Sequence, residues 1–239
     1  MKRIGLSLVA LLFTVIVLGQ KTFNDPNAEV RDVKGFKGVN VATGIQLYIT
    51  QDEQEAVAIS AETPEARARV KTIVQDGVLR IFFENTGLNF KFKYLRKTVK
   101  AYVSIATVEK LGVSSGAVMQ VEGTIKAEKL ELDAHSGGTF KGRVEVASLE
   151  VDHESGSVVK ISGTAGKISV EGSSGSDLSG YELSAEKASV KVSSGASVKL
   201  TINKEVTAKA SSGGELVYKG NATRSDVSTS SGGSVRNSK

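Results

Sequence analysis

Five ionisable residues recur at matched positions in the second half of this sequence. Asp133, Asp152 and Glu171 follow one another at a constant interval, and His135 and Glu154 stand two positions after the first two of them. Carboxylates and an imidazole on one surface can carry protons in a polysaccharide-cleaving reaction or bind a cation. Stacked carboxylates also raise one another's pKa. These five residues therefore form the candidate site, provided that the fold brings them together.

The spacing of the candidate residues is part of a longer repeat. Seven glycines, each preceded by serine, follow one another at nearly constant intervals. A period of about 19 residues is typical of a solenoid, in which each unit stacks on the next. The glycines of the repeat are Gly116, Gly137, Gly156, Gly175, Gly195, Gly213 and Gly232.

The residues before each Ser-Gly alternate between apolar and polar, which predicts β-strands. The inward column is apolar throughout and consists of Leu111, Leu132, Val151, Val170, Val190, Ala208 and Val227. The next, outward column contains Asp133, Asp152 and Glu171, followed by Lys191 and Lys209. The sequence thus predicts an all-β protein, a right-handed parallel β-helix of about seven coils with the candidate carboxylates about 4.8 Å apart on one outer face.

Each Ser-Gly is predicted to be the corner between two strands. Glycine adopts positive φ at little cost, and the serine hydroxyl can bond to the backbone of the corner or to the same serine of the next coil. A functional alternative is that the serines form a hydroxyl-lined ridge that binds a ligand. After each corner the pattern restarts, and many coils reach a second glycine that predicts a second turn.

Residues 1–20 have the features of a secretory signal peptide, because Lys2 and Arg3 precede an apolar run that ends at Gly19. Without this segment the chain has 29 basic and 26 acidic residues, a net charge of +3, which does not favour nucleic acid as a partner. The sequence has no cysteine, which excludes disulfides, zinc thiolates and a cysteine nucleophile. We expect an exported protein of the periplasm, outer surface or extracellular space, with no membrane-spanning helix after the leader.

The domain organisation is predicted to be simple. Residues 21–37 are expected to form a flexible lead-in, and residues 38–236 one β-helical domain. Within it, residues 38–105 supply N-terminal strands that cap the solenoid, and residues 106–236 supply the Ser-Gly coils. Asp76-Gly77 predicts a hairpin turn, and Thr63 before Pro64 predicts a short helix.

A basic run interleaved with aromatic residues precedes the first coil. It could bind anionic glycans or lipid headgroups, or its charges could simply protect an exposed strand pair. The basic residues of this run are Lys91, Lys93, Arg96, Lys97 and Lys100.

Several segments resemble the head GIN domain of auto-transporter adhesins, a family of exported proteins from Bacteroidetes-type bacteria. The similar segments are F-K-G-V-N-V-A-T-G-I-Q-L-Y-I-T-Q (36–51), D-G-V-L-R-I (76–81), A-Y-V-S-I-A-T-V-E-K-L (101–111) and the V-S-S-G-A of the coils. The resemblance covers roughly residues 36 to 235. It implies a β-helical fold and an adhesin-like, non-enzymatic role.

Two functions remain open on the sequence alone. The first is a non-enzymatic adhesin or cell-envelope interaction protein that binds a glycan or another envelope polymer, with no cofactor and no metal. The alternative is a polysaccharide-active β-helix enzyme that uses Asp133, His135, Asp152, Glu154 and Glu171. No arrangement of nucleophile, base and orienting group is recognisable in the sequence, and the acidic residues fit no metal-binding motif.

Overall fold

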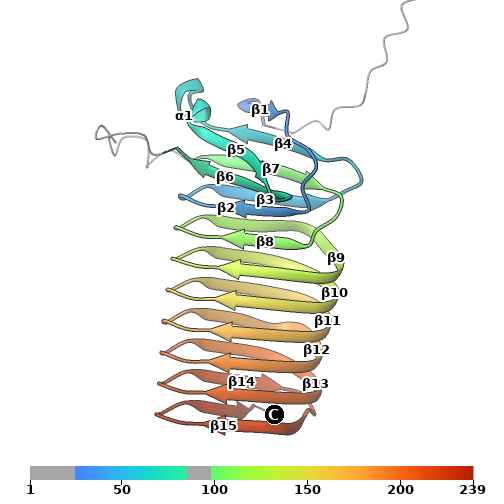
Figure 1. Ribbon diagram of the computed structural model, residues 1–239, viewed down its shortest axis with the longest axis vertical. Helices are drawn as coiled ribbons and strands as arrows, with labels where there is room; N and C mark the ends of the chain where they lie inside the picture. Colours follow the sequence, from blue (N-terminus) through green and yellow to red (C-terminus); the bar gives the residue numbers. More distant parts are fainter. Residues whose placement is uncertain (1–24, 85–97, 239) are drawn as a thin grey trace, which may run out of the picture.

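The computed structural model describes residues 25–84 and 98–238, and these form a right-handed β-solenoid (Figure 1). In Figure 1 the front strands run to the left, the chain returns behind them to the right, and each coil of the repeat lies below the previous one. The first strands are β1 (Ala28–Arg31), β2 (Gly38–Val41), β3 (Gln46–Gln51), β4 (Ala56–Ser60), β5 (Val70–Gln75), β6 (Val78–Phe83), β7 (Lys100–Ile105) and β8 (Lys110–Val113). The coils below them contain β9 (Val118–Ala134), β10 (Thr139–His153), β11 (Val158–Gly172), β12 (Asp177–Val192), β13 (Ser197–Ala210), β14 (Glu215–Lys219), β15 (Thr223–Thr229) and β16 (Ser234–Asn237).

The predicted strand register is confirmed. In the parallel pairs of β9 to β13, Val151 lies beside Leu132 and Val170, and Asp152 lies beside Asp133 and Glu171. The apolar column faces inward, where Leu132 and Val170 are fully buried. The repeat therefore stacks like residues on like residues and forms a continuous core.

The second turn differs from the prediction in the coils that contain β9 to β12. These strands are 15 to 17 residues long and continue through the second glycine without interruption. The register shifts between neighbouring strands at this point, for example between Lys141 and Arg143. The chain bends there at an irregularity of the strand, since a bulge can turn a strand without ending it.

The Ser-Gly corners are tight β-turns in which both central residues have positive φ. In the fourth repeat coil Ser174 has φ 55° and Gly175 has φ 69°, and the Ser176 N–H donates to the Ser173 carbonyl at 3.3 Å. The Gly175 N–H donates to the Ser194 carbonyl of the next coil at 3.0 Å. This backbone ladder recurs at every corner from Gly44 to Gly213. Of the two bonding patterns that the sequence allowed for the serine hydroxyls, the one between corner serines of neighbouring coils is not present among the described residues.

An additional coil is present that the repeat interval did not predict. Thr43 and Gly44 have φ 59° and 72°, and they join β2 to β3 in the same way that Ser115 and Gly116 join β8 to β9. This coil lies between β6 and β7 on one side and β8 and β9 on the other. The coils are therefore not stacked in chain order at this end of the solenoid.

The N-terminal end of the solenoid is covered by antiparallel elements. β4 pairs with β7, and β1 pairs with the outer side of β4 (Figure 1). The predicted short helix is confirmed as α1 (Pro64–Ala68), whose first turn is capped by the Thr63 hydroxyl. The predicted Asp76-Gly77 hairpin joins β5 to β6.

The flexible lead-in that we predicted for residues 21–37 is corrected by two features. β1 lies within it, and the Phe36 side chain is 1% exposed in the core. β1 binds the free edge of β4, so strand pairing holds this part of the predicted lead-in in place.

Two predictions concern residues outside the described part of the chain. These are the signal peptide at residues 1–20 and most of the basic run, residues 91–97. Among the described residues, no helix has the length and apolar character that a membrane crossing requires.

Candidate functional site

The fold brings the three stacked carboxylates together on one outer face of the solenoid. Asp133, Asp152 and Glu171 are register partners on β9, β10 and β11. Lysines lie at both ends of this acidic column. The Lys110 amine is 2.8 Å from Asp133 Oδ2, and the Lys191 amine is 2.7 Å from Glu171 Oε1. The outer two carboxylates are therefore neutralised by ion pairs.

Asp152 occupies the middle of the acidic column. Partial burial raises the pKa of its carboxyl above the ordinary value, and Asp133, Glu154 and Glu171 raise it further because their charges repel a carboxylate. His135 acts in the opposite direction. Asp152 therefore holds a proton more readily than an ordinary aspartate does.

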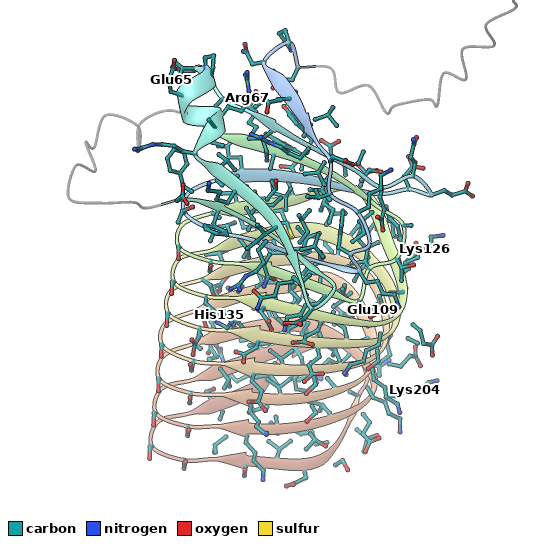
Figure 2. The ribbon with its side chains drawn as sticks, turned by 45° about the horizontal axis from the view of Figure 1, so that its top comes forward. Glu65, Arg67, Glu109, Lys126, His135 and Lys204 are labelled. Carbon is teal, nitrogen blue, oxygen red and sulfur yellow. The ribbon has the colours of Figure 1, made fainter. Side chains whose placement is uncertain are left out.

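His135 and Glu154 lie beside the acidic column, at the residue just before the corner of their coils. His135 Nδ1 is 3.5 Å from Glu154 Oε1, which is a long contact, and Figure 2 shows His135 toward the corner edge of the face. Both residues accept the hydrogen bond that closes their turn through the backbone carbonyl. The turn fixes their backbone positions and leaves the side chains at the surface.

The five predicted residues border two neighbouring hollows. Asp133 and His135 line an upper hollow of about 350 Å³ under the β5–β6 hairpin, together with Asn40, Arg80 and Ile73. A lower hollow of about 430 Å³ is lined by Asp152, Glu154, Glu171, Lys191 and Lys209, among other residues. The candidate residues therefore form one surface patch, but they do not surround a single pocket.

Sequence reasoning missed the partners that come from other parts of the chain. Lys110 precedes the first repeat corner, and Asn40 and Arg80 come from β2 and β6. The Asn40 side chain occupies the space beside Gly112, where a Cβ would lie 2.1 Å from Asn40 Oδ1. The V-A-T-G of residues 41–44 could have revealed this coil, because it resembles the V-S-S-G of the later corners.

His153 is separate from the surface patch. Its side chain points into the solenoid and is 0% exposed, and neither ring nitrogen has a hydrogen-bond partner. Burial lowers the pKa of His153 to about 4. The ring lies against Gly172 of the next coil, where a Cβ would come within 2.6 Å of Nε2. His153 is thus a neutral core residue.

The chemistry available on the patch is limited to proton exchange and charge pairing. Within residues 25–84 and 98–238, no group of three or more His, Cys, Asp or Glu residues is placed to hold a metal ion. Lysines are paired with the carboxylates at the two ends of the acidic column, Asp133 and Glu171.

Several solved structures share this fold. A putative adhesin from Bacteroides fragilis NCTC 9343 aligns with 88% of this chain and 95% of its own, with a TM-score of 0.78 and 17% identity. A putative adhesin from Parabacteroides merdae ATCC 43184 aligns with 89% of this chain and 95% of its own, with a TM-score of 0.71 and 14% identity. A putative lipid binding protein from Parabacteroides distasonis ATCC 8503 aligns with 90% of this chain and 98% of its own, with a TM-score of 0.63 and 15% identity.

At these low sequence identities, the structural similarity shows that the proteins share a fold. No curated protein sequence has a significant similarity to this chain. The family described as "Putative auto-transporter adhesin, head GIN domain" matches residues 35–222, which is most of the sequence, and the chain therefore belongs to this family.

Proposed function

We propose that this protein is an exported, non-enzymatic adhesin that binds a glycan or another cell-envelope polymer along its β-solenoid. The observation that carries this proposal is the strict register of exposed side chains on successive coils, such as Asp133, Asp152 and Glu171. A surface that repeats about every 4.8 Å offers a polymer many similar contacts. Weak contacts of this kind add up when one chain occupies several of them at once.

The state of the carboxylates supports binding over catalysis. Asp133 and Glu171 are held in ion pairs with Lys110 and Lys191, and a charge that is already paired is a poor proton carrier. The family and the structures of similar fold carry adhesin names, which agrees with this proposal. The mature protein would begin after residue 20, and residues 38–236 would act as one body.

A second candidate function is polysaccharide cleavage. The raised pKa of Asp152 favours it, because a carboxyl that keeps its proton can act as a general acid toward a glycosidic oxygen. Glu154 on the same coil would then be the base. Both groups line the lower hollow, which is open to solvent.

The test is an array of bacterial and host glycans and matrix proteins, probed with the mature protein and with Glu154→Gln. We expect saturable binding without product release, and an affinity for Glu154→Gln within about tenfold of the wild type, or 1.4 kcal/mol, because one carboxylate is a small part of a distributed surface. Release of shortened glycan by the wild type that is lost in Glu154→Gln would overturn the adhesin proposal and establish the enzyme.

A further inference from the structure

We propose that a basic groove on the face opposite the acidic column binds an acidic polysaccharide, a glycan chain that bears carboxylate or sulfate groups. The inference rests on the proposed polymer-binding function, and it specifies a second surface and the chemical class of the ligand. The groove crosses the strand segments that follow the corners of β9 to β12, which form the back face in Figure 1.

The groove forms where the strands bend at the second glycine of each coil. Its volume is about 680 Å³. At Gly142 a Cβ would meet Val121 Cγ2 at 2.7 Å and Phe140 Cζ at 2.9 Å, so the packing below excludes a side chain there. Glycine at this position therefore leaves room for the buried Phe140 ring, and Gly142 itself is part of the groove lining. The residues along its rim and floor include Gln120, Gly123, Lys141, Arg143, Lys160, Ser162, Ser179, Tyr181 and Glu182.

The positive charges of the groove have no acidic partner. Lys141 and Lys160 are register partners on β10 and β11, both are exposed, and neither they nor Arg143 form an ion pair with a carboxylate among the described residues. Like charges placed opposite each other in a sheet destabilise it. An anionic group bound between the two amines would relieve this repulsion.

The edge of the solenoid that lies away from the corners differs from the groove in how its charges are paired. Lys126 pairs with Glu145 of the next coil at 3.2 Å, and Lys204 pairs with Glu186 at 2.5 Å. Figure 2 shows Lys126 and Lys204 along the edge that lies away from the corners. At this edge, Lys126 and Lys204 are each neutralised by a carboxylate of an adjacent coil. Lys141 and Lys160 differ from the lysines of this edge, because neither amine is paired with a carboxylate of an adjacent coil among the described residues.

The groups around the lysines suit a sugar chain. Ser162 and Ser179 present hydroxyls, and the Tyr181 ring lies at one end of the groove with the Lys219 amine 4.5 Å from its centre. Glu182 is the one carboxylate among the residues that line the groove. The coil spacing of about 4.8 Å is close to the length of one pyranose unit in an extended polysaccharide. Successive acidic sugars can therefore meet successive lysines.

An aromatic pair extends the same column toward the capped end. Lys141 is aligned with Gln120, which is aligned with Tyr48, and Tyr48 stacks on Tyr102 with ring centres 5.5 Å apart. Tyrosine combines an apolar ring with a polar tip, as sugar rings combine apolar faces with hydroxyl edges. A polymer that follows the column would pass from the lysines to these rings.

The experiment measures binding of polygalacturonate and chondroitin sulfate by calorimetry, with dextran as a neutral polymer and phosphatidylglycerol vesicles as an anionic lipid surface. We expect the wild type to bind one or both acidic glycans, more weakly as salt is added, and to bind dextran much more weakly. Lys141→Glu with Lys160→Glu should lower the affinity at least tenfold. The matched control is Lys34→Glu with Lys167→Glu, which makes the same change of charge at two exposed lysines outside the groove and should leave the affinity within threefold.

The outcomes separate the groove from the wider function. An equal loss in both double variants would mean that net charge alone attracts the glycan, and the groove would be rejected. Glycan binding that survives in Lys141→Glu with Lys160→Glu would also reject the groove, but it would leave the adhesin proposal intact. Binding to vesicles without binding to either acidic glycan would assign the surface to lipids and overturn the inference.

A wild type that binds no polymer in the array would remove both proposals. Circular dichroism and thermal melting should show that the variants fold, since both lysine side chains are exposed. If the charge reversal unfolds the protein, Lys141→Gln with Lys160→Gln serves in its place and should lower the affinity in the same direction by a smaller factor.

Discussion

At the scale of single residues, His153 is the most constrained polar side chain of the solenoid. Its imidazole is fully buried without a hydrogen-bond partner for either nitrogen, an arrangement that is tolerable only while the ring is neutral. The residue that follows it in the same inward column is Gly172, and the absence of a side chain there leaves space for the ring. The core thus accommodates the buried imidazole ring because the next coil has no side chain at the matching position.

The burial of His153 predicts a loss of stability in acid. The folded-state pKa is about 4, below the unfolded value of about 6.5, so between these pH values the unfolded chain takes up a proton that the folded chain refuses. The free energy of unfolding should fall by about 3 kcal/mol from this residue as the pH drops from 7 to 4. The difference in the free energy of unfolding between the wild type and His153→Ala, measured by urea titration, should therefore become smaller by about 3 kcal/mol between pH 7 and pH 4. Val151→Ala is the control, because it removes buried atoms of the same coil without removing an ionisable group, and its stability gap should not follow this pH dependence. Parallel pH curves for the wild type and His153→Ala would contradict the assignment.

At the scale of the structural element, the corner turn is the unit that repeats most strictly. Each corner places a serine and a glycine in the left-handed region, as a type I′ turn requires. A non-glycine residue with positive φ is strained, and the strain recurs at each serine from Ser115 to Ser231. The backbone hydrogen bond from each corner glycine to the next coil offsets part of this cost.

Substitutions at the serine and at the glycine of a corner should therefore change the free energy of unfolding in opposite directions. Gly175→Val should lower the free energy of unfolding by about 1–3 kcal/mol through backbone strain alone, because no atom lies within 4 Å of the added Cβ. Ser174→Asn should raise the stability, because asparagine tolerates positive φ better and Asn-Gly is a preferred pair for this turn. Gly172→Ala is the comparison, since its cost would come from contact with His153. Equal melting temperatures for Gly175→Val and the wild type would disprove the strain argument.

The same elements show how far the sequence determines the fold. Strand periodicity and the Ser-Gly interval were enough to predict the coils, the inward column and the stacking of Asp133, Asp152 and Glu171. They could not predict the coil at Thr43 and Gly44, because this corner stands far outside the regular interval and its place depends on a pairing with β8, a distant part of the chain. The Lys110 ion pair and the basic groove were missed for a related reason. Which charges remain unpaired is decided by neighbours on adjacent coils.

At the scale of the whole molecule, each repeat coil contacts mainly the coils directly above and below it. In such a structure the stability is approximately a sum of coil energies and interface energies. Deleting residues 177–196 removes one complete coil and should leave the others in register. Glu171 would then meet Lys209, and Lys167 would meet Glu205, so both new contacts would join opposite charges.

We expect this shortened protein to fold and to melt in one transition at a lower temperature, as measured by circular dichroism. Deleting residues 177–186 removes only half of that coil and is the control. It should prevent folding of the lower coils, because the inward and outward columns could no longer align. Similar melting curves for the two deletions would mean that the coils are not interchangeable units.

The coil that contains Thr43 and Gly44 has a consequence for the order in which the chain can assemble. β2 finds its partners only in β6 and β8, and Lys110, the partner of Gly38, is synthesised long after it. The edges of β2 and β3 that bind β8 and β9 therefore stay open until these much later strands are available to close them. Unpaired edges are the part of a β protein most exposed to wrong partners. Once β8 and β9 have closed over them, every later coil finds its template already in place. Assembly should therefore begin with one slow closure at the capped end and continue as a rapid zippering toward β16.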